Sequence, residues 1–220
     1  MSGFLKSSIG RKIAMALSAL FLMIFLLQHF AINITSVFSE SLFNELSHFM
    51  GTNPVVQFAL QPILIFGVIF HFVMGFVLEI KNKGARNVKY VKNHGAANSS
   101  WMSRNMIWSG LVILAFIVLH FIDFWFPEIN HKYIEFLPED PNRYYHEVVE
   151  KFHSPIRVGA YVVAFVLLAM HLLHGFSSAF QSVGANNKYT RGLKGFGKAY
   201  AILIPLGFIF IALFHHINGH

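Results

Sequence analysis

The chain has 220 residues, of which 55% are hydrophobic and only 12% are charged, whereas soluble domains carry about a quarter charged residues. Its formal net charge is +7, and it contains no cysteine. This composition indicates an integral membrane protein. The missing thiols exclude disulfides, cysteine-ligated iron–sulfur clusters, a thiolate heme ligand and covalent heme attachment.

Five apolar segments are long enough to cross about 30 Å of hydrocarbon at ~1.5 Å per residue. The first has no small-residue cleavage site, so we expect it to be a retained helix and not a removed signal peptide. The chain is therefore predicted to be one all-α transmembrane domain, residues 1–220, folded as a bundle of five helices. We predict the spans at about 13–34, 55–80, 105–126, 155–180 and 199–216.

The charged residues alternate from one side of the predicted membrane to the other. The N-terminus and the loops between spans two and three and between spans four and five hold 13 of the 17 basic residues, with Glu79 as their only acid. The opposite side holds the other nine acids and four basic residues. By the positive-inside rule, the N-terminus lies inside and the C-terminus outside. A basic surface for nucleic acid would not alternate loop by loop, so no nucleic-acid partner is expected.

Histidines recur inside the spans, where an ionisable side chain is costly and usually functional. His29 and His120 each lie about 16 or 17 residues into an outward-running helix, roughly 25 Å from the inner face. His71 and His171 lie on inward-running helices, about ten residues or roughly 14 Å from that face. Depth therefore predicts an outer pair and an inner pair. Depth alone does not choose between His171 and His174, which lies one turn further along, nor does it exclude His215, which reaches the outer level.

A local motif distinguishes the inner histidines. His71 and His171 both occur in His-x-x-x-Gly-Phe, so Gly75 and Gly175 share a helix face with them. A glycine at that position lets a flat macrocycle approach the backbone. His174, which lies one turn past His171 on nearly the same face, has no such glycine.

The outer histidines share a shorter pattern. His29 and His120 are each followed by phenylalanine. Together with the inner motif, this suggests that helices one and two are weakly repeated as helices three and four.

Two matched histidine pairs on four consecutive helices predict two b-type hemes with axial ligands His29, His120, His71 and His171. Imidazole on both faces of the iron leaves no open position, which suits electron transfer. The competing hypothesis is a heme-free transporter with a histidine proton relay. Such relays usually also use intramembrane carboxylates, and the only acids near the predicted spans, Glu79 and Asp123, are close to span ends.

The pattern resembles the di-heme cytochrome b subunit of succinate dehydrogenase and fumarate reductase, and the resemblance covers essentially the whole chain. It rests on the helix number, the histidine order and four segments: Leu27-Gln28-His29-Phe30, Ser47-His48-Phe49-Met50, Phe70-His71 with Gly75, and His171 with Gly175. The resemblance implies ligation by His171 in helix four, not His174, and no ligand in helix five. One departure is Ala169, which stands where some fumarate reductases have a glutamate linked to proton transfer, so that pathway is not expected here.

The resemblance also implies partners and a place in the cell. It implies a multi-pass subunit of the bacterial cytoplasmic membrane that anchors a flavoprotein (FAD) subunit and an iron–sulfur subunit at the inner face. Electrons would pass through the inner and then the outer heme to a quinone of the menaquinone type. The basic inner loops would contact the iron–sulfur subunit, anionic lipid, or both.

Further site residues are predicted from polarity near the span ends. Glu45, His48 and Asn53 are quinone candidates, because the resemblance points to the loop between helices one and two. Candidates for the heme propionates are Arg11, Arg104, Arg157 and, more weakly, Ser18. A cytochrome b subunit of another quinone-linked enzyme, such as a hydrogenase or formate dehydrogenase, is an alternative to the leading hypothesis.

Overall fold

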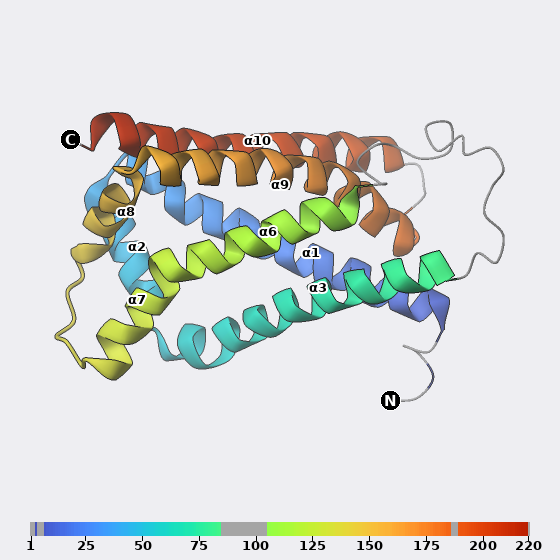
Figure 1. The fold of residues 1–220 in the computed structure, drawn as a ribbon, viewed down its shortest axis with the longest axis horizontal. Helices are drawn as coiled ribbons and strands as arrows, with labels where there is room; N and C mark the ends of the chain where they lie inside the picture. The colour runs from blue at the N-terminus through green and yellow to red at the C-terminus, as the bar shows by residue number, and fades with distance from the viewer. Residues whose placement is uncertain (1–2, 4–6, 85–104, 186–188, 220) are drawn as a thin grey trace.

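The computed structural model describes residues 3, 7–84, 105–185 and 189–219, and every regular element within these ranges is a helix. Five helical stretches are long and apolar enough to cross a membrane, which confirms the predicted multi-pass all-α architecture. They lie side by side, and the first begins at the end of the bundle opposite to where the last one ends (Figure 1). These stretches are Ser8–Val37, Val56–Asn82, Met106–Ile134, Pro155–Ser182 and Thr190–Asn218.

The first half of the chain forms two spanning helices with a short helix between them. α1 begins where the Ser7 hydroxyl accepts a hydrogen bond from the backbone N–H of Gly10, at 2.9 Å, an N-cap that satisfies one free donor. The elements are α1 (Ser8–Asn33), the 3-10 turn η1 (Ile34–Val37), α2 (Glu40–Thr52), the π-helical η2 (Val56–Leu60) and α3 (Gln61–Gly84).

The second half repeats this plan and adds a fifth span. A long composite helix is followed by a short helix and then by two long helices. The elements are α6 (Met106–His120), η3 (Phe121–Trp125), α7 (Phe126–Ile129), η4 (Asn130–Ile134), α8 (Arg143–Phe152), α9 (Pro155–Ser182) and α10 (Thr190–Asn218).

The helix that carries the third span is longer than the predicted range of 105–126. It passes through Pro127 and ends at Ile134. Proline lacks an N–H and its ring crowds the carbonyl four residues earlier, and the π-helical turn of η3 contains that carbonyl, on Asp123. The wider turn absorbs the proline without ending the helix. As a result Asp123 lies within a continuous helix that runs past the predicted range to Ile134.

α9 is the central helix of the bundle. It packs against α10, α6 and α1, while α1 also packs against α3. The Phe165 ring on α9 stacks on Phe208 of α10 with their centroids 5.2 Å apart. In the most apolar window of α10, 44% of the residues are buried, against 6% for Met106–Ile134, so α10 is the most enclosed of the five spanning helices and Met106–Ile134 the least.

The short helices α2 and α8 close the end of the bundle at which α10 ends (Figure 1). The side-chain carbonyl of Asn44, buried on α2, accepts a hydrogen bond of 2.8 Å from the backbone N–H of Tyr145 on α8. The imidazole of His216 on α10 bonds the backbone carbonyl of Phe152 at 2.8 Å. These contacts tie both short helices to the spanning bundle.

A glycine permits the closest approach of α9 and α10. A Cβ at Gly197 would lie 2.8 Å from Cδ1 and 3.0 Å from Cγ of Phe176, which is buried and cannot easily move. We expect Gly197→Ala to lower the free energy of unfolding by about 1–3 kcal/mol, as overpacking does. Detergent-driven unfolding in mixed micelles would measure this change.

The matched control is Gly195→Ala on the same helix. Nothing lies within 4 Å of a Cβ at Gly195, so alanine is expected to leave stability unchanged or raise it by up to ~1 kcal/mol through helix propensity. Equal effects of the two substitutions would contradict this account of the α9–α10 contact.

Candidate functional site

The structure brings the four intramembrane histidines together in the two pairs predicted from depth. The rings of His29 on α1 and His120 on α6 have centroids 5.7 Å apart. The rings of His71 on α3 and His171 on α9 have centroids 6.4 Å apart. Each pair is formed by two different helices, and all four residues are only partly covered by protein.

These spacings suit two imidazoles that bind opposite faces of one metal. With a metal–nitrogen distance of about 2 Å and a ring centre about 1 Å beyond each nitrogen, the centroids would be roughly 6 Å apart. The observed 5.7 and 6.4 Å bracket this value. The donor set therefore fits a bis-histidine heme at both levels.

Each inner histidine is held by a serine on a neighbouring helix. Nδ1 of His71 lies 3.1 Å from Oγ of Ser18 on α1. Nδ1 of His171 lies 3.1 Å from Oγ of Ser109 on α6. Each imidazole is thus anchored through Nδ1, and its Nε2 remains available for a ligand.

The space beside the two motif glycines is bordered by methionines. A Cβ at Gly75 would meet only the methyl group of Met15, at 3.7 Å. A Cβ at Gly175 would meet the methyl groups of Met106, at 3.7 Å, and Met23, at 3.9 Å. Unbranched methionine side chains adapt easily to a neighbour, so a flat ring can approach the backbone at both glycines.

The serines and methionines reveal a clearer internal repeat than the histidines alone. Met15, Ser18 and His29 on α1 have the same spacing as Met106, Ser109 and His120 on α6: Met-x2-Ser-x10-His. Eleven residues make about three helical turns, so the serine and the following histidine share one face, about 16 Å apart along the axis. α1 and α6 each therefore serve an inner site with a serine and an outer site with a histidine.

The outer pair is enclosed by aromatic rings and has no serine partner. Phe25 stacks on His29 with centroids 5.5 Å apart, and Phe124 lies 5.2 Å from His120. Nδ2 of Asn33 is 3.4 Å from Nδ1 of His29. Within the described part of the chain, the buried Nδ1 of His120 has no hydrogen-bond partner. The two levels therefore present their histidines in different polar surroundings.

His174 and His215, the two other candidate ligands, differ in burial and in hydrogen bonding. Of the two α9 histidines, it is His171 whose ring faces His71; His174, one turn further along, is partly buried. His215 is 1% exposed, and its Nε2 lies 2.8 Å from Oγ of Ser36. Nε2 of His215, the nitrogen left available at the inner histidines, is thus already bonded.

Comparison of the chain with known protein families, with curated proteins and with solved structures finds no match. Among the described residues, no three or more His, Cys, Asp or Glu side chains are grouped to hold a bare metal ion. A bis-histidine heme needs only two protein ligands, because the macrocycle supplies the rest. The site is therefore interpreted from its own geometry.

The propionate candidates have diverse surroundings. Arg11 lies in the first turn of α1 and is partly buried, whereas Arg104 lies outside the described residues. Ser18 is engaged by His71 and donates its hydroxyl to the backbone carbonyl of Met15 at 2.8 Å. Arg157 forms an ion pair with Asp123. Of these, Arg11 lies near the start of the first spanning helix.

The ion pair of Arg157 belongs to a small buried cluster beside the outer histidines. Nη2 of Arg157 lies 3.1 Å from Oδ1 of Asp123, and the hydroxyl of Tyr161 donates to Oδ2 at 2.9 Å. The Tyr161 ring is 6.4 Å from that of His120. The buried carboxylate of Asp123 is therefore paired with a cation and a hydroxyl donor, as a buried charge requires.

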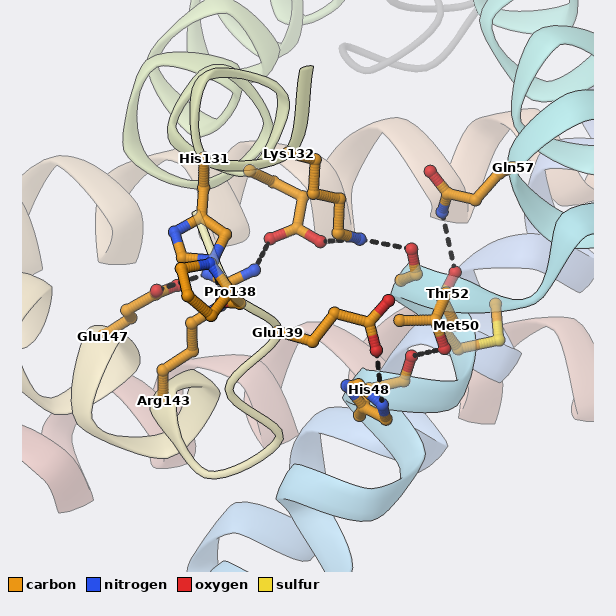
Figure 2. Close-up of polar contacts among 12 residues, drawn as sticks. His48, Met50, Thr52, Gln57, His131, Lys132, Pro138, Glu139, Arg143 and Glu147 are labelled. Atoms are coloured by element: carbon orange, nitrogen blue, oxygen red, sulfur yellow. Dashed lines mark hydrogen bonds and ion pairs between the residues drawn. The ribbon is translucent and has the colours of Figure 1, made fainter. Parts of the chain in front are cut away.

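A second polar site lies at the end of the bundle closed by α2 and α8 (Figure 2). It is a shallow pocket of about 20 Å³, which is room for about one water molecule. Nε2 of His48 lies 3.8 Å from Oε2 of Glu139 across it, and the buried Nδ1 of His48 has no hydrogen-bond partner among the described residues. The lining residues are His48, Thr52, His131, Lys132, Leu137, Glu139, Asp140, Arg143 and Tyr144.

A network of ion pairs adjoins this pocket through Lys132 and Arg143. Glu128 pairs with Lys132 and Arg143, and Arg143 also pairs with Glu147. Burial opposes the charge on Arg143, but hydrogen bonds to Glu128 and Glu147 outweigh it and raise the pKa of Arg143. Burial and the nearby Glu128 raise the pKa of Tyr144 to about 12. Both groups therefore keep their protonated forms at neutral pH.

The three quinone candidates are not brought together. His48 lines the pocket, whereas Glu45 is exposed on α2 and is not among the lining residues. The side-chain carbonyl of Asn53 accepts hydrogen bonds from the backbone N–H groups of Val55 (2.9 Å) and Val56 (3.3 Å). Asn53 therefore caps the start of the second span, as a short amide side chain does.

Several residues of the site were missed from the sequence, above all Ser109, Met15 and Met106. The signal was present, since the Met-x2-Ser-x10-His spacing occurs twice. A single serine in an apolar helix is common, so only comparison of the two halves would have revealed it.

Proposed function

We propose that this chain is the di-heme cytochrome b membrane anchor of a succinate:quinone oxidoreductase. His29 and His120 would bind an outer heme b, and His71 and His171 an inner one. When bound, the hemes supply one-electron carriers across the membrane. The observation that carries the proposal is that two histidine pairs on four helices face each other at 5.7 and 6.4 Å.

The surrounding residues support this role. Ser18 and Ser109 orient the inner imidazoles, and Gly75 and Gly175 leave room for a flat ring beside them. The phenylalanines around His29 and His120 exclude water from the outer level. Dry surroundings and two imidazole ligands favour electron transfer over oxygen chemistry.

The partners follow from the resemblance described above. A flavoprotein and an iron–sulfur subunit would dock at the end that carries the basic loops, which the positive-inside rule makes the inner face. A quinone of the menaquinone type would react at the opposite end, the end at which His48 lies on α2. The protein would be a multi-pass component of the bacterial cytoplasmic membrane.

The test is a reduced-minus-oxidised visible spectrum of the purified chain, combined with a pyridine hemochrome assay. The proposal expects b-type bands and two hemes per chain. A chain purified from heme-replete cells without such bands would overturn it.

One observation bears on the transporter alternative and concerns the buried carboxylate of Asp123. It is 3% exposed and is occupied by Arg157 and Tyr161, which is unlike a relay group that must exchange protons. An absence of heme bands together with histidine-dependent transport would favour that alternative.

A further inference from the structure

We propose that Ser18 and Ser109 are positioning residues that fix the tautomer of the two inner heme ligands and thereby tune the inner heme alone. This inference rests on the proposed function and adds to it two residues on helices that contribute no ligand to the inner heme. The two serines occupy equivalent places in the repeated halves of the bundle, at Met-x2-Ser-x10-His.

The direction of each hydrogen bond follows from the serine's other contact. The hydroxyl of Ser18 donates to the backbone carbonyl of Met15 at 2.8 Å. That of Ser109 donates to the carbonyl of Met106 at 2.9 Å. Because a hydroxyl has one proton, each Oγ can only accept from the imidazole that lies 3.1 Å away. Nδ1 of His71 and of His171 must therefore carry the ring proton.

This arrangement has a chemical consequence for the ligand nitrogen. A neutral imidazole protonated at Nδ1 presents an unprotonated Nε2, which is the form that binds a metal. A hydrogen bond from Nδ1–H also raises the basicity of the ligand and fixes the ring orientation. A more basic ligand stabilises the oxidised iron more than the reduced iron, so the serines lower the midpoint potential of the inner heme.

Among the described residues, no serine accepts a hydrogen bond from an outer histidine, so the expected change in midpoint potential is confined to the inner heme. Nδ1 of His120 has no hydrogen-bond partner among the described residues, and His29 has only an amide at 3.4 Å. A potential difference between the two levels can therefore arise from the serines without any change of ligand type.

The experiment compares Ser18→Ala, Ser109→Ala and the double variant with the wild type in lipid nanodiscs by potentiometric titration. The inner step is assigned with His120→Ala, which removes the outer heme. Each alanine is expected to raise the midpoint potential of the inner heme. A tenfold change in the ratio of the affinities for oxidised and reduced heme corresponds to about 59 mV for a one-electron couple. Heme affinity at the inner site is expected to fall about tenfold or more.

Two controls separate tuning from general damage. Ser109→Thr keeps a hydroxyl that can bond the same carbonyl and should restore the wild-type potential. Ser36→Ala removes a serine–histidine bond of 2.8 Å to His215, which ligates no heme in the proposal, and should leave both potentials unchanged.

The outcomes distinguish the two proposals. If two hemes bind but the serine variants leave the inner potential and affinity unchanged, or shift both hemes equally, the serine inference fails and the proposed function stands. If the wild type binds no heme, the proposed function fails and the serine inference fails with it.

Discussion

His171→Ala is expected to reduce the heme content from two hemes per chain to one and to remove the inner potentiometric step. Loss of an axial imidazole leaves the inner iron with a single protein ligand, and the macrocycle is then poorly retained. His71→Ala should lose the same heme, because these two rings face each other. His29→Ala and His120→Ala should instead lose the outer heme. The pyridine hemochrome assay measures each loss.

The double variant and a neighbouring histidine provide the controls. His71→Ala combined with His171→Ala should lose no more heme than either alone, since both remove one shared site. His174→Ala, which alters the same helix one turn further along, should keep both hemes. If His174→Ala loses a heme while His171→Ala keeps both, then His171 is not the heme ligand in helix four.

Asp123→Ala is expected to lower the free energy of unfolding by about 3 kcal/mol. Breaking a buried ion pair costs about 3–5 kcal/mol because the remaining charge is left unpaired. The lower end applies here, since the Arg157 side chain is 32% exposed and can partly reach water. The Tyr161 hydroxyl also loses its acceptor. Detergent-driven unfolding in mixed micelles measures the change.

An exposed acid at the same end of the bundle supplies the matched control. Glu150→Ala removes a carboxylate from the surface of α8 and is expected to change stability by no more than ~0.5 kcal/mol. Asp123→Ala combined with Arg157→Ala should cost less than the sum of the single variants, because neither charge is then left alone. Additive effects would show that the ion pair does not couple the two helices.

The five spans could be predicted because membrane helices follow from local composition. Each needs about 20 apolar residues in sequence, and this requirement does not depend on the neighbours. The helix of the third span continues beyond the predicted range for a physical reason. Pro127 normally ends a helix, but the π-helical turn at Phe121–Trp125 carries the helix past it to Ile134. Such a turn depends on packing around the chain and leaves no clear local pattern.

The candidate site, too, could be predicted only in part from the sequence. Composition and spacing alone placed His29, His71, His120 and His171 at two depths, because depth in a membrane is a count of residues along a straight helix. Only the tertiary structure showed which polar groups meet across helices, as between Ser109 and His171 or Arg157 and Asp123. Rotation of each helix about its axis decides those contacts, and packing of the whole bundle sets that rotation.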